Sequence, residues 1–163
     1  MGHRSPAGRA LPRPWRRLAE ASGQSLVELA LTLPLLVFGL VAGADLARAY
    51  ALQLAVQNGA RAGAEAAAIG KYPTQSQITS RAQDEMNRTP GMDATGATVT
   101  VSLKQLDGLA DCFDPPTPTV PCYATVRVQY TFRTVTPWPL VPNSATFDRQ
   151  TTMRTITGGA LQP

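Results

Sequence analysis

The fold of this 163-residue chain is decided by a stretch near its N-terminus, residues 24–44, which reads QSLVELALTLPLLVFGLVAGA. Its one charged side chain is Glu28, and most of its other side chains are aliphatic or small. A helix of about 20 such residues is long enough to cross the hydrocarbon core of a bilayer. We therefore expect a membrane-spanning helix that ends near residue 44, preceded by a short leader and followed by the bulk of the chain.

The leader, residues 1–23, is strongly basic. It holds five arginines and one glutamate, so the net charge of +4 of the whole chain belongs to it. Positive charge accumulates on the cytoplasmic side of membrane helices. The pattern thus predicts a cytoplasmic leader and an extracytoplasmic C-terminus, and it explains the charge without a nucleic-acid partner. Prolines and glycines in the leader favour disorder.

Residue counts argue against catalysis. The chain has one histidine, His3, and two cysteines, and it contains no glycine-rich phosphate-binding loop. Histidine-based triads and clustered histidine or cysteine metal sites are therefore excluded. Three aspartates at positions 107, 111 and 114 do not follow the spacing of a calcium-binding loop. We expect no enzyme activity, cofactor or metal.

A processing motif begins at Gly23, where the sequence reads GQSLVE. A cut after Gly23 makes Gln24 the new N-terminus and Glu28 its fifth residue. Glu28 either lies at the membrane interface and stays hydrated, or it pairs with a cation. The freed α-amine would be a cation in lipid, and a carboxylate one turn further along, its own or a neighbour's, is its natural partner. A basic leader, a glycine and this glutamate before an apolar run resemble a class III prepilin leader, which a prepilin peptidase removes.

The longer stretch 23–65, about a quarter of the chain, resembles the TadE family of minor pilin-like proteins of tight-adherence (Flp-type) pilus systems. The resemblance rests on Gln24-Ser25-Leu26-Val27-Glu28, Leu33-Pro34-Leu35, Asp45 with Arg48, and Gln57-Asn58-Gly59-Ala60-Arg61. Family members usually have an aromatic residue after the glutamate, where this chain has Leu29. The resemblance implies a structural subunit of the cytoplasmic membrane. Its implied partners are the prepilin peptidase, other pilin-like subunits, the pilus assembly machinery and membrane lipid.

Two other functions fit parts of the pattern. The first is a major filament subunit, but Flp-type major pilins are usually far shorter than this chain. Alternatively, Ala42-Gly43-Ala44 resembles a signal peptidase site, and a cut after Ala44 would release a secreted binding protein. Against that cut, Pro34 splits the apolar run early, and helical sequence continues through Ala44 to about Ile69.

The segment 24–69 is expected to form one long helix, because Pro34 is its only proline before Gly70 and Pro73. Pro34 should kink this helix. Every fourth residue from position 39 is small, and these residues are Gly39, Gly43, Ala47, Ala51, Ala55, Gly59, Gly63 and Ala67. A ridge of small residues allows close helix packing, so we expect neighbouring helices to lie there. Chance in an alanine-rich segment is the alternative explanation.

The remaining residues, 70–163, are expected to form an extracytoplasmic α+β head. Thr74 and Gln77 form a capping box that opens a short helix to about Arg88. Alternating apolar and polar residues predict strands near residues 97–104, 124–133 and 146–156. A long N-terminal helix packed with a roughly three-stranded antiparallel sheet is a pilin-like arrangement.

Two loops join the predicted strands. Cys112 and Cys122 flank a proline-rich loop between the first and second strands, and an extracytoplasmic location favours a disulfide between them over two free thiols. The segment Pro139-Leu140-Val141-Pro142 is read as the connection between the second and third strands, with a polyproline ligand as the alternative.

Overall fold

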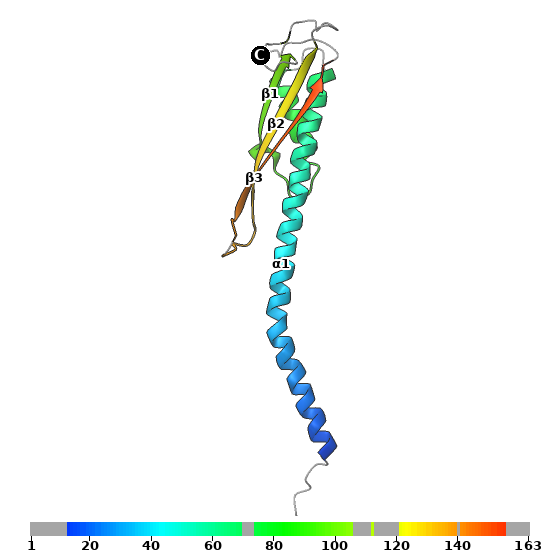
Figure 1. Ribbon diagram of the computed structural model, residues 1–163, viewed down its shortest axis with the longest axis vertical. Helices are drawn as coiled ribbons and strands as arrows, with labels where there is room; N and C mark the ends of the chain where they lie inside the picture. Colours follow the sequence, from blue (N-terminus) through cyan, green and yellow to red (C-terminus); the bar gives the residue numbers. More distant parts are fainter. Residues whose placement is uncertain (1–12, 70–73, 106–111, 113–120, 140, 156–163) are drawn as a thin grey trace, which may run out of the picture. The chain divides into compact units, whose positions relative to one another are not determined.

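The computed structural model describes residues 13–69, 74–105, 112, 121–139 and 141–155 (Figure 1). The chain divides into two compact units, Met1–Gly43 and Ala44–Pro163. The helices are α1 (Arg13–Ile69), α2 (Gln75–Met86) and a short 3-10 helix, η1 (Ala94–Gly96). The strands are β1 (Thr98–Gln105), β2 (Cys122–Arg133) and β3 (Ser144–Arg154). The expected α+β class and element order are confirmed.

Helix α1 begins at Arg13, earlier than the expected start at Gln24. The prediction of a disordered leader is therefore wrong for residues 13–23, while residues 1–12 lie outside the described part. Pro14 lies in the first turn, where its missing N–H costs no helical hydrogen bond. The residues that follow are mostly good helix formers, including arginine, leucine and alanine. The helix continues through Pro34 and ends at Ile69, as expected.

The apolar part of α1 fits a single-pass membrane anchor. Among the described residues, one helix, over Gly23–Ile69, has the length and composition to cross a membrane. The side chains from Gly23 to Val41 are exposed in this chain, as those of a helix surrounded by lipid would be. The hydroxyl of Thr32 donates to the Glu28 carbonyl oxygen over 2.9 Å. This bond satisfies a polar group within an otherwise apolar segment.

Helix α2 begins at the expected capping box. The Gln77 N–H donates to Thr74 Oγ1, and the Thr74 N–H donates to Gln77 Oε1, both over 3.2 Å. The predicted apolar face, Ile78, Ala82 and Met86, is buried. The helix ends at Met86, two residues before the expected end.

The sheet is antiparallel, as expected, and its strand order is β1-β2-β3 (Figure 1). Val126 at the centre of β2 lies opposite Val101 of β1 and Thr151 of β3. One face of β2 is buried with the C-terminal part of α1 and with α2. This core contains Val56, Ala60, Ala64, Ile78, Met86, Ala124, Val126 and Val128.

The opposite face of the sheet is polar and exposed. Arg127 of β2 forms an ion pair with Asp148 of β3, and Gln129 donates to the same carboxylate over 3.0 Å. Hydrogen bonds from Arg127 and Gln129 lower the pKa of Asp148 to about 2. Polar pairs across the strands thus stabilise the face that is in contact with water, while the apolar face packs against the helices.

The ridge of small residues on α1 is divided between two environments. Ala55, Gly59, Gly63 and Ala67 are buried within the chain's own head. A Cβ atom at Gly59 would lie 2.5 Å from Met86 Cγ and 3.0 Å from the Ala82 carbonyl oxygen. The expectation that neighbouring helices pack along the whole ridge is therefore corrected for these four residues. At Gly59 and Gly63 the small size is required by the close approach of α2 and β2. Gly39, Gly43 and Ala47 are exposed, and Ala51 is half-buried.

This division predicts opposite effects of the same substitution at two glycines. Gly59→Leu should destabilise the head by about 1–3 kcal/mol, because the new side chain overpacks the contact with Met86. Gly43→Leu should leave the free energy of unfolding unchanged or raise it slightly, because no atom lies within 4 Å of a Cβ there. Denaturant titration of the full chain in micelles measures both values. Equal stabilities would contradict the packing described.

Candidate functional site

The residues of the expected processing motif all lie on α1. Gly23, Gln24 and Glu28 are exposed, and a Cβ atom at Gly23 would meet no other atom within 4 Å. Gln24 and Glu28 are four residues apart on a continuous helix, so they share one face. In the described part of the chain, no group pairs with the Glu28 carboxylate. The geometry therefore leaves both ends of the motif accessible.

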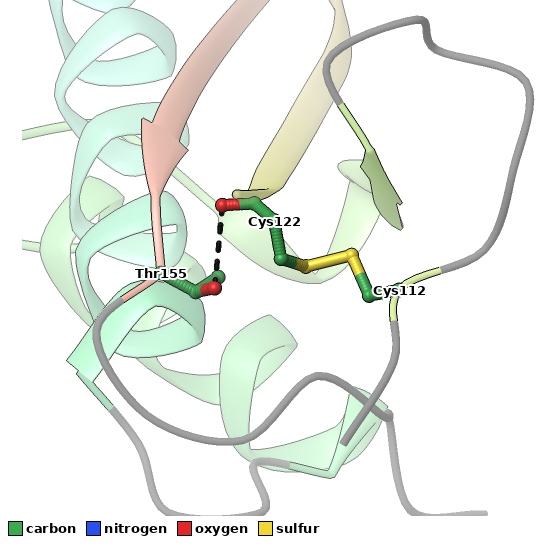
Figure 2. Close-up of a disulfide and its surroundings, with 3 residues drawn as sticks. All are labelled: Cys112, Cys122 and Thr155. Atoms are coloured by element: carbon green, nitrogen blue, oxygen red, sulfur yellow. Dashed lines mark hydrogen bonds between the residues drawn. A yellow bond between two sulfur atoms is a disulfide. The ribbon is translucent and has the colours of Figure 1, made fainter. Parts of the chain in front are cut away.

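Cys112 and Cys122 form the expected disulfide, with a Cα–Cα distance of 5.5 Å (Figure 2). Cys122 is the first residue of β2 and is buried. Its carbonyl oxygen accepts hydrogen bonds from the Thr155 N–H over 2.9 Å and from the Thr155 hydroxyl over 3.3 Å. The disulfide thus joins Cys112 to the first residue of β2, beside the end of β3. The three aspartates considered above lie outside the described residues.

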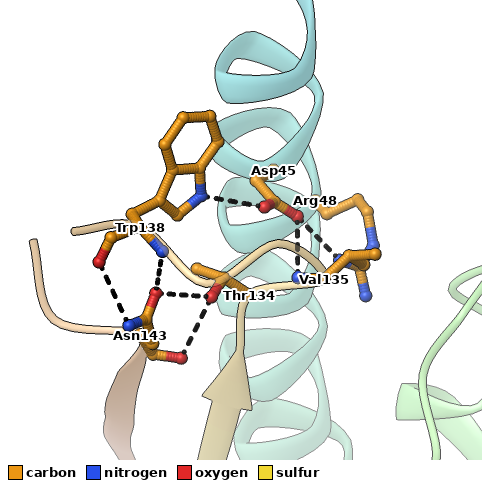
Figure 3. A network of polar contacts seen from close by, with 6 residues as sticks. All are labelled: Asp45, Arg48, Thr134, Val135, Trp138 and Asn143. Carbon is orange, nitrogen blue, oxygen red and sulfur yellow. Dashed lines mark hydrogen bonds and ion pairs between the residues drawn. The ribbon is translucent and has the colours of Figure 1, made fainter. Parts of the chain in front are cut away.

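A second polar centre forms around Asp45, the first charged residue after the apolar stretch (Figure 3). Its side chain is almost fully buried, and the residue is 7% exposed. Oδ1 accepts from the Val135 N–H over 3.2 Å, and Oδ2 accepts from Trp138 Nε1 over 3.2 Å. Arg48, one turn along α1, lies 3.0 Å from Oδ1. Asp45 therefore joins α1 to residues about 90 positions further along the chain.

The electrostatics of this centre keep Asp45 ionised. Burial raises the pKa of Asp45 and is the largest single effect. The hydrogen bonds with Val135, Trp138, Thr136 and Arg48 together lower it by more, so the net pKa is below the ordinary value. Asp45 lies outside the apolar stretch 24–44. The Arg48 guanidinium carbon also lies 5.7 Å from the centroid of the Phe132 ring, which is within the range of a cation–π contact. Arg48 thus neutralises the carboxylate and packs on the end of β2.

The two partners of Asp45 outside α1, Val135 and Trp138, belong to the β2–β3 loop, residues 134–143. Hydrogen bonds of Asn143 join one side of this loop to the other. The side-chain oxygen of Asn143 accepts from the Trp138 N–H over 2.6 Å and from the Thr134 hydroxyl over 3.2 Å. Its amide donates back to the Trp138 carbonyl oxygen over 3.3 Å. The Asn143 bonds therefore help to hold the Trp138 indole and the Val135 N–H in positions where both donate to Asp45 (Figure 3).

Sequence reasoning placed Asp45 and Arg48 only within the family resemblance and did not connect them to this loop. Pro139, Val141 and Pro142 lie in the β2–β3 connection, as expected, and Leu140 lies outside the described residues. Two features of the sequence could have pointed to this site. Asp45 directly follows the apolar stretch, and Trp138 lies in a loop without charged residues. Nothing in the spacing of residues 45 and 138 indicates that they meet.

These features describe an α+β protein with one helix long and apolar enough to cross a membrane, and without a metal-binding cluster among its described residues. Comparison with known families identifies part of it. Residues 23–65 match the model of the TadE family, described as TadE-like protein. The resemblance found in the sequence is thus confirmed for these residues, and the family is a structural one associated with tight-adherence (Tad) pili. No curated protein and no solved structure matches the chain.

The Asp45 network predicts a specific change in hydrogen exchange. Asp45→Asn removes the charge and one acceptor oxygen, so the Val135 N–H and the Trp138 indole N–H should exchange roughly tenfold faster or more, since bonds to a charged acceptor are among the stronger ones. Asp84→Asn, on the exposed side of α2, is the matched control and should change neither rate. NMR-detected exchange in micelles measures both. Unchanged rates in Asp45→Asn would contradict the assigned bonds.

Proposed function

We propose that this chain is a minor pilin-like subunit of a tight-adherence (Flp-type) pilus system, anchored in the cytoplasmic membrane with its head outside. The observation that carries the proposal is the TadE match over residues 23–65, which begins at the proposed cleavage residue and covers the membrane-capable part of α1. The function is structural: the helix anchors the subunit and contributes to contacts with other pilin-like subunits and the assembly machinery.

A prepilin peptidase removes the leader after Gly23 in this proposal. The new α-amine of Gln24 and the Glu28 carboxylate then lie one turn apart on the same helix face. Because the Glu28 side chain is exposed, it is equally accessible to the α-amine of a neighbouring subunit. Pairing with either amine lowers the cost of holding a carboxylate at the edge of the hydrocarbon.

Two observations support the proposed orientation. Five arginines precede the apolar stretch, which favours a cytoplasmic N-terminus. The head contains the Cys112–Cys122 disulfide, a bond that persists mainly in oxidising compartments outside the cytoplasm. Residues 70–163 are also long for a Flp-type major pilin, which favours a minor subunit over the main filament subunit.

A released binding protein is the second candidate. The compact unit Ala44–Pro163 begins at the residue after which a signal peptidase would cut to leave Asp45 as the N-terminus. The mature N-terminus separates the two candidates, because prepilin processing retains the apolar helix and signal peptidase processing discards it.

Intact mass and N-terminal sequencing of the protein from its native host should give a mature chain that begins at Gln24. Gly23→Ala should block this cleavage while leaving membrane insertion unchanged. Ala44→Leu, which disrupts the signal peptidase pattern, is the control and should leave the start at Gln24. A wild-type start at Asp45 would reject the pilin-like function. An uncut wild-type chain would reject the processing step.

Assembly should depend on Glu28 and on the exposed part of the ridge. Glu28→Leu removes an expensive charge, so it should preserve insertion but weaken crosslinking between subunits and surface piliation. Gly43→Leu should weaken both because it separates neighbouring helices. Glu65→Leu removes the same charge from the head and is the control. If Glu28→Leu and Gly43→Leu both show wild-type crosslinking and piliation at equal protein levels, then α1 acts only as an anchor and its proposed assembly role is rejected.

A further inference from the structure

The β2–β3 loop is held at the end of the apolar stretch of α1. Asp45 directly follows Ala44, the last residue of that stretch, and a helix rises only 1.5 Å per residue. Both carboxylate oxygens of Asp45 accept hydrogen bonds from the loop, one from the Val135 N–H and one from the Trp138 indole. The loop therefore lies at the level where α1 leaves the hydrocarbon, provided that α1 spans the membrane as proposed above.

The composition of the loop suits that level. Residues 134–147 contain no aspartate, glutamate, lysine or arginine. Val135 is 73% exposed and Val141 is 56% exposed, and the three prolines of the loop are also exposed. Tryptophan is enriched at the membrane–water interface, and gathered exposed apolar side chains mark sites of contact with membranes or other proteins.

Charges around the loop are also arranged for contact with lipid. The Asp45 carboxylate is neutralised by Arg48 and by its hydrogen bonds, so the loop presents no unpaired carboxylate there. Arg133, which is exposed at the end of β2 directly before the loop, supplies a cation beside it. Guanidinium groups in this position can bind lipid phosphates while their stems lie against apolar surface.

We propose that the β2–β3 loop is a second membrane contact, which lies in the outer interfacial layer of the bilayer that α1 crosses. Lipid is favoured as the partner because the bonds to Asp45 keep the loop beside the end of the apolar stretch. The contact would hold the head at a fixed depth relative to the bilayer. This inference rests on the proposed membrane anchoring and adds the loop, the leaflet and the residues that make the contact.

The test uses the full chain with Trp15→Phe, which leaves Trp138 as the only tryptophan. The protein is reconstituted in vesicles of phosphatidylethanolamine and phosphatidylglycerol that contain a phospholipid brominated either near the headgroup end or near the methyl end of its acyl chains. Trp138 fluorescence should lose intensity with the shallow bromine and lose much less with the deep bromine. No loss with the shallow bromine would overturn the proposal.

Two reporters in the Trp15→Phe, Trp138→Phe background serve as references. Phe38→Trp, within the apolar stretch, should be quenched by bromine in the acyl chains, and failure here would reject the membrane anchor itself. Tyr123→Trp, at the opposite end of β2 from Arg133, should not be quenched by either lipid. Quenching of the Phe38 reporter without quenching of Trp138 would overturn the loop contact alone.

A matched pair of charge substitutions then tests the apolar surface of the loop. Val141→Asp in the Trp15→Phe chain should reduce the quenching of Trp138, because it places a carboxylate in the interfacial layer. Ser80→Asp adds the same charge to the exposed side of α2 and should have no effect. Equal quenching in both variants would overturn the contact of this surface with lipid.

Discussion

The head depends on the close approach of α1 to α2 and β2. A Cβ atom at Gly59 would lie 3.0 Å from the Ala82 carbonyl oxygen in the backbone of α2. A Cβ atom at Gly63 would lie 3.0 Å from Val126 Cγ1 of β2. Small residues at these positions allow Met86 and Val126 to be buried directly against the helix. The apolar face of a small sheet needs such a cover, because a three-stranded sheet alone buries too little surface.

A single carboxylate ties the sheet to the helix at the other end of the head. Asp45 takes its partners from its own helix and from the β2–β3 loop, and every bond spans either one helical turn or about 90 residues. Asn143 forms hydrogen bonds with the backbone of Trp138 within the loop. These bonds help to orient the loop's donors toward the Asp45 carboxylate. A buried charge is tolerated there because it is both paired and hydrogen-bonded.

Local patterns predicted the elements, while the contacts between distant elements were not predictable from them. The capping box at Thr74, the buried face of α2 and the three strands follow from spacing and alternation along the chain. The early start of α1 was missed because proline and arginine were read as disorder, although Pro14 is compatible with a first turn. The small-residue ridge was assigned to neighbouring helices, because a single sequence does not show which surface its own head will cover.

The two carboxylates that bound the apolar stretch differ in where their partners come from. Asp45 is satisfied within the chain, by Arg48 and the β2–β3 loop. Glu28 is exposed, and no group pairs with its carboxylate in the described residues. Under the proposed function, in which α1 crosses the membrane, pairing with an α-amine lowers the cost of the Glu28 carboxylate at the edge of the hydrocarbon. The same constraint thus yields an internal fastening at one end of the stretch and, under the proposed function, a site for an α-amine at the other.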